Sequence, residues 1–212
     1  MTRLRPALVV ALMLATATVT TAHAADEKGR FAVKGPGLAT CQDFVNHVKD
    51  KSQTFYVMGG WLLGFLSAHN LHMEDTYDAA SWQSGELLLG LMENYCRQRP
   101  EERFAEGTIK LIRLLMPNRL TTESRLVRAE NGQNRVAVYE EVMRRTQQAL
   151  KDQGYYVGVI DGLYGPGSKN ALTKFQDANK LPTTGVPDPR TLFALFREEL
   201  RPPQPADKKN DQ

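Results

Sequence analysis

Apolar residues recur at helical spacing between residues 41 and 116, and they predict four helices there. The first begins after Thr40, because Thr40 followed by Asp43 forms a capping box just before an apolar run. The second, residues 55–71, is apolar on nearly every side. This pattern predicts a buried central helix, and the segment is too short for a membrane span.

The third and fourth helices each carry an apolar stripe on one side. The third runs over residues 85–97, and the fourth begins at Pro100 and is stopped by Pro117. A polar segment, residues 117–135, follows, and we interpret it as a linker with room for a short helical piece. The stripe residues are Leu87, Leu88, Leu91, Met92 and Tyr95 in the third helix and Phe104, Thr108, Leu111, Ile112 and Leu115 in the fourth.

Helix ends and turns follow one another in the same order twice in the second half of the chain. Gly154 ends a helix over residues 138–153, Asp161-Gly162 makes a tight turn, and Gly165-Pro166 opens a helix over residues 166–179. Asp188-Pro189 then opens a third helix, residues 189–199. The chain is therefore predicted to be all-α, with a four-helix domain at residues 41–116 and a three-helix domain at residues 136–200.

This order of residues closely resembles the peptidoglycan-binding domain family with three helices, which is appended to many cell-wall enzymes. Ser168 stands where threonine is more common in the family, and it keeps the hydroxyl. The residues that carry the resemblance are Gln148, Leu150, Gly154, Tyr155, Tyr156, Asp161, Gly162, Gly165, Pro166, Ser168, Ala171, Phe175, Gln176, Leu181, Gly185, Asp188, Thr191, Leu192 and Leu195.

The resemblance implies peptidoglycan as the ligand, and its sugar rings, amides and charged peptide stems suit exposed aromatic and polar side chains. Tyr156, Asp161, Tyr164 and Gln176 are the candidate ligand-binding residues. Each has a structural alternative. Asp161 builds the turn before it can be a ligand contact, and either tyrosine could instead pack its ring in the core.

The first 24 residues read as an export signal that is cleaved after Ala24. Arg3 and Arg5 precede an apolar stretch, and Ala22-His23-Ala24 has the small-x-small cleavage pattern. Cleavage lowers the formal charge from +3 to +1, because it removes two arginines and no acid. A nearly neutral chain gives no electrostatic case for nucleic acid or anionic lipid as partner. Residues 25–40 are then an N-terminal extension, and residues 201–212 have the composition of a disordered tail.

Cys41 and Cys96 are the only cysteines, and an exported chain meets an oxidising compartment, so we expect a disulfide between the first and third helices. A reactive thiol or a metal ligand is the alternative, but neither cysteine has a second cysteine or a histidine beside it at ligand spacing.

The first domain more loosely resembles small secreted helical proteins with one disulfide. That group includes immunity proteins of type VI secretion systems and is reminiscent of acid-stress periplasmic chaperones. The resemblance rests on Cys41, on the run of residues 60–67 with Asn70, and on Asn94-Tyr95-Cys96 with Pro100. It implies an interaction domain that binds another protein. Gly60 and Gly64 lie on one face of the second helix, and we expect them to let a neighbouring helix approach closely.

Residues for catalysis or metal binding are few. His69 and His72 precede Glu74 and Asp75, but this group is more typical of a solvated helix end than of a zinc site, so we expect no metal and no cofactor. Glu86 and Glu93 are expected on an exposed helix face without a sugar cleft. The prediction is a non-enzymatic periplasmic protein that binds peptidoglycan and a second protein. The alternatives are an immunity protein or chaperone positioned by its wall module, and a wall hydrolase with an unrecognised site.

Overall fold

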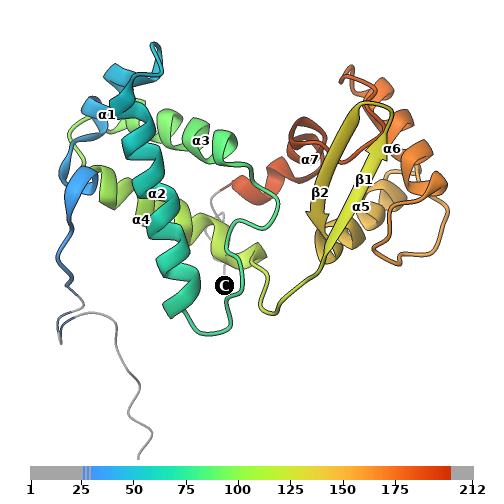
Figure 1. The fold of residues 1–212 in the computed structure, drawn as a ribbon, viewed down its shortest axis with the longest axis horizontal. Coiled ribbons are helices and arrows are strands. Elements are labelled where there is room, and N and C mark those ends of the chain that lie inside the picture. Colours follow the sequence, from blue (N-terminus) through green and yellow to red (C-terminus); the bar gives the residue numbers. More distant parts are fainter. Residues whose placement is uncertain (1–25, 27, 29, 202–212) are drawn as a thin grey trace, which may run out of the picture. The chain divides into compact units, whose positions relative to one another are not determined.

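The structure, a computed structural model, describes residues 26, 28 and 30–201 (Figure 1). The export signal predicted at residues 1–24 and the tail after Arg201 lie outside the described residues. Residues 33–201 belong to one compact unit, which contains both predicted halves.

The first half contains four helices around one core. Thr40 caps the first helix as predicted, because its side chain accepts a hydrogen bond from the Asp43 backbone while the Asp43 carboxylate accepts one from the Thr40 backbone. Ser52 and Ser84 cap the next two helices in the same position. After a 3-10 turn at Gly35–Leu38, the helices are α1 (Cys41–Val48), α2 (Gln53–His72), α3 (Gly85–Gln98) and α4 (Phe104–Leu115).

The fourth helix begins at Phe104 and not at Pro100. The residues between them pair with the start of α1: the Cys41 N–H donates to the Glu102 carbonyl at 2.7 Å, and the Phe104 N–H donates to the Ala39 carbonyl at 2.8 Å. These bonds to a distant segment hold residues 100–102 in a turn and Arg103 in an isolated bridge with Thr40, so the helix begins only after them. A disulfide joins Cys41 in α1 to Cys96 in α3, as expected, and both residues are fully buried.

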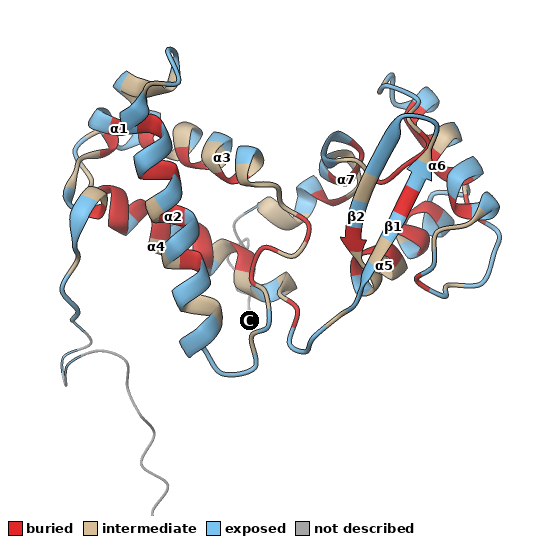
Figure 2. Ribbon diagram, in the orientation of Figure 1, coloured by how far each residue is buried: buried red, intermediate tan, exposed pale blue. Residues whose placement is uncertain are grey.

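The second helix is buried on one side only, so the prediction of a wholly buried central helix is wrong. Phe55, Met58, Leu62 and Leu66 enter the core, whereas the opposite side faces solvent (Figure 2). A Cβ placed on Gly60 or Gly64 would meet no atom within 4 Å, so no helix within residues 30–201 approaches there, contrary to the expectation. The exposed apolar residues of α2 are Tyr56, Val57, Leu63 and Leu71.

The all-α prediction holds only in part: the described chain is mostly helical, but the segment expected to be a linker holds a β-hairpin. β1 (Leu126–Asn131) pairs antiparallel with β2 (Asn134–Tyr139), and Gly132 in the two-residue turn has a positive φ of 61°. Only Ala129 and Val138 of the hairpin are buried. Because β2 reaches Tyr139, the next helix begins at Glu140 and not at residue 138.

The second half contains the three expected helices around a second core. α5 is Glu140–Asp152, α6 is Pro166–Ala178 and α7 is Pro189–Phe196, followed by a 3-10 turn at Arg197–Leu200. Trp82, from the loop between α2 and α3, is buried among the residues of this second core. Two cores agree with a two-domain layout, although the exact domain boundaries stay predictions. Within residues 30–201, no helix combines the length and apolarity needed to cross a membrane.

Candidate functional site

The loop that follows α5 is held by one buried side chain, Gln147. Its amide nitrogen donates to the Asp161 carboxylate at 2.8 Å, to the Leu163 carbonyl at 3.0 Å and to the Ser168 hydroxyl at 3.1 Å. Its amide oxygen accepts from the Gly162 N–H at 2.8 Å, and Gly162 has a positive φ of 74° that favours glycine. The tight Asp161-Gly162 turn is therefore anchored from inside the domain.

The loop that follows α6 repeats this arrangement around Gln176. The Gln176 amide nitrogen donates to the Thr184 hydroxyl, the Val186 carbonyl and the Thr191 hydroxyl, at 2.8 to 2.9 Å. Its oxygen accepts from the N–H of Gly185, which again has a positive φ. The repeat of turn and helix start predicted from the sequence is thus a repeat of hydrogen bonds.

Two of the predicted ligand-binding residues, Tyr156 and Gln176, are buried inside the domain beside these anchored turns. Gln176 is fully buried, and both atoms of its amide are bonded within the domain. Tyr156 is 8% exposed, and its hydroxyl donates to the Val159 carbonyl at 2.8 Å. Neither side chain offers a free polar group to a ligand, so the structure gives both an architectural role.

The other two predicted residues lie at the surface of the loop. Asp161 accepts from Gln147 and from the Leu163 N–H, and these hydrogen bonds, in that order, lower the pKa of its carboxyl group. The Tyr164 hydroxyl donates to the Gly185 carbonyl at 2.8 Å, and burial raises its pKa. Each residue keeps part of its side chain accessible, so ligand contact by Asp161 and Tyr164 stays a prediction.

The sequence analysis missed three apolar side chains that the same loop exposes. Val157 is 100%, Val159 77% and Leu163 45% exposed, on a loop that lies on the outside of the second core (Figures 1 and 2). The bond from the Tyr156 hydroxyl to the Val159 carbonyl fixes the backbone between the two valines. The missed signal was apolar residues inside a turn-rich stretch, where water-facing residues are usually polar. We call Val157, Val159 and Leu163 the apolar tip.

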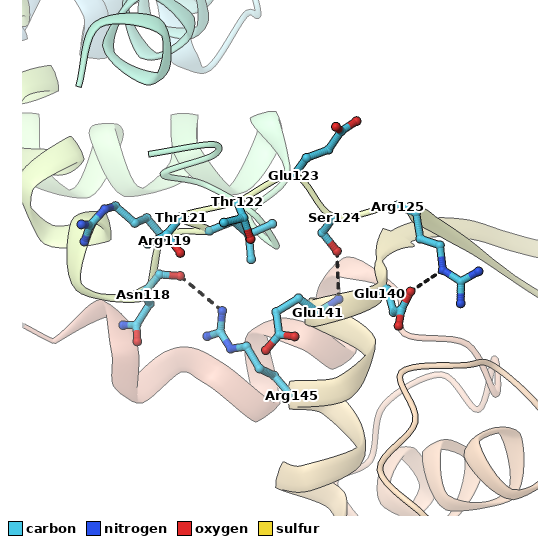
Figure 3. Close-up of a pocket in the computed structure, with 11 residues that line it drawn as sticks. Asn118, Arg119, Thr121, Thr122, Glu123, Ser124, Arg125, Glu140, Glu141 and Arg145 are labelled. Carbon is cyan, nitrogen blue, oxygen red and sulfur yellow. Dashed lines mark hydrogen bonds and ion pairs between the residues drawn. The ribbon is translucent and has the colours of Figure 1, made fainter. Parts of the chain in front are cut away.

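A polar cavity lies at the start of α5, beside the chain that leads into the hairpin (Figure 3). On one side it is lined by residues 118–125, and on the other by Glu140, Glu141 and Arg145 of α5. Arg145 donates to the Asn118 carbonyl at 3.3 Å, and the Ser124 hydroxyl accepts from the Glu141 N–H at 3.1 Å. These bonds join the two walls.

The candidate metal residues do not come together. Among the described residues, no three His, Cys, Asp or Glu side chains gather as metal ligands. The His69 ring nitrogen lies 3.2 Å from the Met116 sulfur, and burial lowers the pKa of His69.

Three helices joined by two glutamine-anchored turns make the second half a small helical module. Residues 140–195 match the family described as "Putative peptidoglycan binding domain". This match confirms the resemblance seen in the sequence, and residues 140–195 are a domain of that family. It covers the module only, not the helical first half.

Two curated proteins share a short similar segment with this chain. One, "Putative OxPP cycle protein OpcA" of Nostoc punctiforme, is 42% identical over 65 residues, which are 31% of this chain and 13% of that protein. A protein of the same description from Synechococcus elongatus is 42% identical over 60 residues, 28% of this chain and 13% of its own. The chain thus spans a small part of either relative's length. No solved structure matches the chain.

Proposed function

We propose that this chain is an exported, non-catalytic cell-wall protein that binds peptidoglycan through its second half and another protein through its first. The observation that carries the proposal is the family match over residues 140–195. The mostly helical fold, and the two anchored turns that the match includes, agree with a rigid binding module rather than with a flexible connector.

The apolar tip is the proposed contact with the wall. A sugar ring has an apolar face, and exposed valine and leucine side chains on a fixed loop can pack against it without first being ordered. The Gln147 bonds supply that fixation, because they hold both the turn and the carbonyl of Leu163. Asp161 and Tyr164 stand in the same loop and can add polar contacts to amide or hydroxyl groups. Affinity from so small a surface is modest, and repeated sites on the polymer raise retention.

Export to the periplasm is proposed from the sequence of residues 1–24 and from the Cys41–Cys96 disulfide. Disulfides persist in oxidising compartments and are rare where thiols are kept reduced. A wall ligand also lies outside the cytoplasm, so the ligand, the disulfide and the leader are mutually consistent.

The exposed face of α2 supports protein binding by the first half. From Gln53 to His72 the helix carries no Asp, Glu, Lys or Arg, yet Tyr56 is 60% and Leu71 78% exposed. Soluble helices usually place charges on the side that faces water. A photo-crosslinking residue at Leu63 should give adducts with a second protein, whereas the same residue at the exposed Glu106 of α4 should not. Equal labelling from both positions would contradict an interface on α2.

Co-sedimentation of the mature chain with purified sacculi tests the wall-binding proposal. We expect the protein in the pellet with sacculi and in the supernatant without them, and protein that stays wholly in solution would overturn the proposal. Release of muropeptides during the incubation would instead favour a wall hydrolase. Protection of cells against a toxin encoded beside this chain would favour an immunity protein that uses the module for positioning.

A further inference from the structure

The β-hairpin has an open edge along β2. The Glu140 N–H donates to the Arg125 carbonyl at 2.8 Å at the base of the hairpin, and bonded pairs alternate with non-bonded pairs along an antiparallel ladder. Ala137 and Arg128 consequently form a non-bonded pair, whose backbone N–H and C=O groups point away from the partner strand. No other described residue bonds to the backbone of Ala137, so these groups can pair with another chain.

The two edges of the hairpin differ in charge. Arg128 and Glu130 stand on β1, and charged residues on an edge strand discourage pairing with another chain. Residues 136–139 of β2 carry no charge. This part of the β2 edge therefore lacks the protection that β1 has.

A cavity of about 450 Å³ runs along this part of β2. It touches four consecutive residues, 136–139, and consecutive strand residues face opposite sides of a sheet, so the cavity lies along the edge and not on one face. Its other side is formed by the loop of residues 81–84 and by Pro187, Pro189 and Leu192 around the start of α7. Its volume lies within the range of cavities that hold small ligands.

The wall opposite β2 is fixed, and it carries a buried hydroxyl without a partner. Trp82 holds this loop in place, because its Nε1 donates to Glu199 at 3.0 Å and its ring packs against Phe196. The Ser81 Oγ lines the cavity, is buried, and has no hydrogen-bond partner among the described residues. An unpaired buried hydroxyl costs free energy, so a ligand that bonds to it regains that cost. The strand edge and the hydroxyl thus point independently to a hydrogen-bonding ligand.

The lining of the cavity indicates the chemistry of that ligand. No Asp, Glu, Lys or Arg of the described residues lines it, so a charged ligand would lose hydration without gaining an opposite charge. Trp82, Val138 and Leu192 offer apolar surface instead. An extended peptide supplies main-chain groups at the spacing of a strand edge and side chains that alternate between two sides. Because a wall stands opposite β2, one extended chain fits here, whereas a hairpin from a second copy does not.

We propose that the β2 edge binds an uncharged, extended segment of another protein, which adds a strand to the hairpin. The main chain of the segment pairs with Ala137 on one side and bonds to the Ser81 hydroxyl on the other, and its apolar side chains pack against the cavity wall. This inference goes beyond the proposed function, because it places a peptide site in the second half of the chain, apart from the apolar tip and from α2.

A fluorescent five-residue peptide of alternating valine and threonine, with both ends blocked, is the probe, and anisotropy measures its binding to the full mature chain. Ala137→Pro should bind it at least about tenfold more weakly than wild type, because proline has no N–H to donate and its ring blocks the edge. Arg128→Pro is the matched control and should bind as wild type does. It lies opposite Ala137 in the hairpin, so it perturbs the same pair but removes an N–H from the other edge.

Ser81→Ala leaves the hairpin untouched and tests the other wall of the cavity. It should bind the probe about threefold more weakly than wild type, the size of one neutral hydrogen bond. N-methylation of the probe tests strand pairing, because alternate amides of a strand face the same neighbour. Probes methylated at the valine amides alone and at the threonine amides alone should therefore differ in affinity by about tenfold.

Four results would overturn the peptide site. They are wild-type protein that does not bind the probe, equal binding by Ala137→Pro and Arg128→Pro, equal affinity for the two methylated probes, and displacement of the probe by an oligomer of N-acetylglucosamine but not by unlabelled peptide. A wild-type dimer in sedimentation that Ala137→Pro abolishes would also overturn it, since the edge would then pair with a second copy. None of these measurements uses sacculi, so failure of the peptide site leaves wall binding intact.

Discussion

Gln147 and Gln176 occupy equivalent places in two successive helix-turn units and share three kinds of hydrogen bond. Each amide oxygen accepts from a glycine N–H in the following turn. Each amide nitrogen donates to the carbonyl one residue later and to the hydroxyl at the start of the next helix. Because both side chains are fully buried, water cannot replace a bond that is lost.

Replacing either glutamine by leucine should therefore destabilise the fold. We expect Gln147→Leu and Gln176→Leu each to lower the free energy of unfolding by about 2 to 4 kcal/mol, because buried donors and acceptors are left unpaired. Gln148→Leu is the matched control, since Gln148 is exposed and bonds only to Asp152; it should change stability by less than about 0.5 kcal/mol. Urea denaturation measures all three. Equal losses of unfolding free energy at positions 147 and 148 would show that the buried side-chain hydrogen bonds stabilise the fold no more than the exposed one does.

The disulfide should contribute strongly to the stability of the first half. It closes a loop with a sequence separation of 55 residues, for which the chain-entropy account gives about 4 kcal/mol. Cys41→Ala combined with Cys96→Ala should lower the urea midpoint accordingly, and reduction of the wild-type protein should have the same effect. An unchanged midpoint after thiol titration has confirmed full reduction would contradict this expectation.

Trp82 should couple the unfolding of the first half to that of the second. Its ring packs against Phe196 with ring centroids 5.6 Å apart, and its Nε1 donates to Glu199 at 3.0 Å. Trp82→Ala should cost about 3 to 5 kcal/mol and turn one unfolding transition into two, because the large buried ring is removed. Trp82→Phe keeps most of the packing, loses the hydrogen bond, and should cost about 1 to 2 kcal/mol. Calorimetry records these transitions. If Trp82→Ala unfolds in a single transition at the wild-type temperature, Trp82 does not couple the two halves.

Acid should destabilise the protein through Asp161. Hydrogen bonds from Gln147 and from the Leu163 backbone lower the pKa of Asp161 in the folded state. A lowered carboxyl pKa adds stability that is present above the ordinary pKa of about 4 and is lost as the pH falls through the folded value. Asp161→Asn should therefore lose less stability than wild type between about pH 5 and pH 2.5 in urea titrations. Parallel pH profiles for the two proteins would contradict the role given to the Asp161 carboxylate.

Helix positions in the second half could be predicted because each boundary has its own local signal. Gly154, Pro166 and Asp188-Pro189 act within a few residues of where they stand, and the structure keeps all of them at helix ends. The capping box at Thr40 is another local signal, and it is confirmed. The hairpin was missed because only Ala129 and Val138 are buried, so the alternation typical of a strand is weak, although a glycine such as Gly132 is common in a two-residue hairpin turn.

The site residues could be predicted less well than the helices, and burial is the reason. Tyr156 and Gln176 belong to the motif because they build the turns, and a motif alone does not separate a residue that holds a loop from one that touches a ligand. Gln147 gives no separate signal in the sequence, since the exposed Gln148 stands beside it. The apolar tip was missed for the opposite reason, because valine in a loop is usually taken to point inward.

Retention on sacculi after removal of the apolar tip tests the central claim most directly. The full mature chain with Val157→Ser and Val159→Ser should bind purified sacculi at least about tenfold more weakly than wild type, the loss of one to two kcal/mol of apolar contact. Leu71→Ser is the matched control, because Leu71 is 78% exposed on α2, outside the binding module, and this variant should bind as wild type does. Equal retention of the double variant and wild type, with both folded by circular dichroism, would contradict wall binding through this loop.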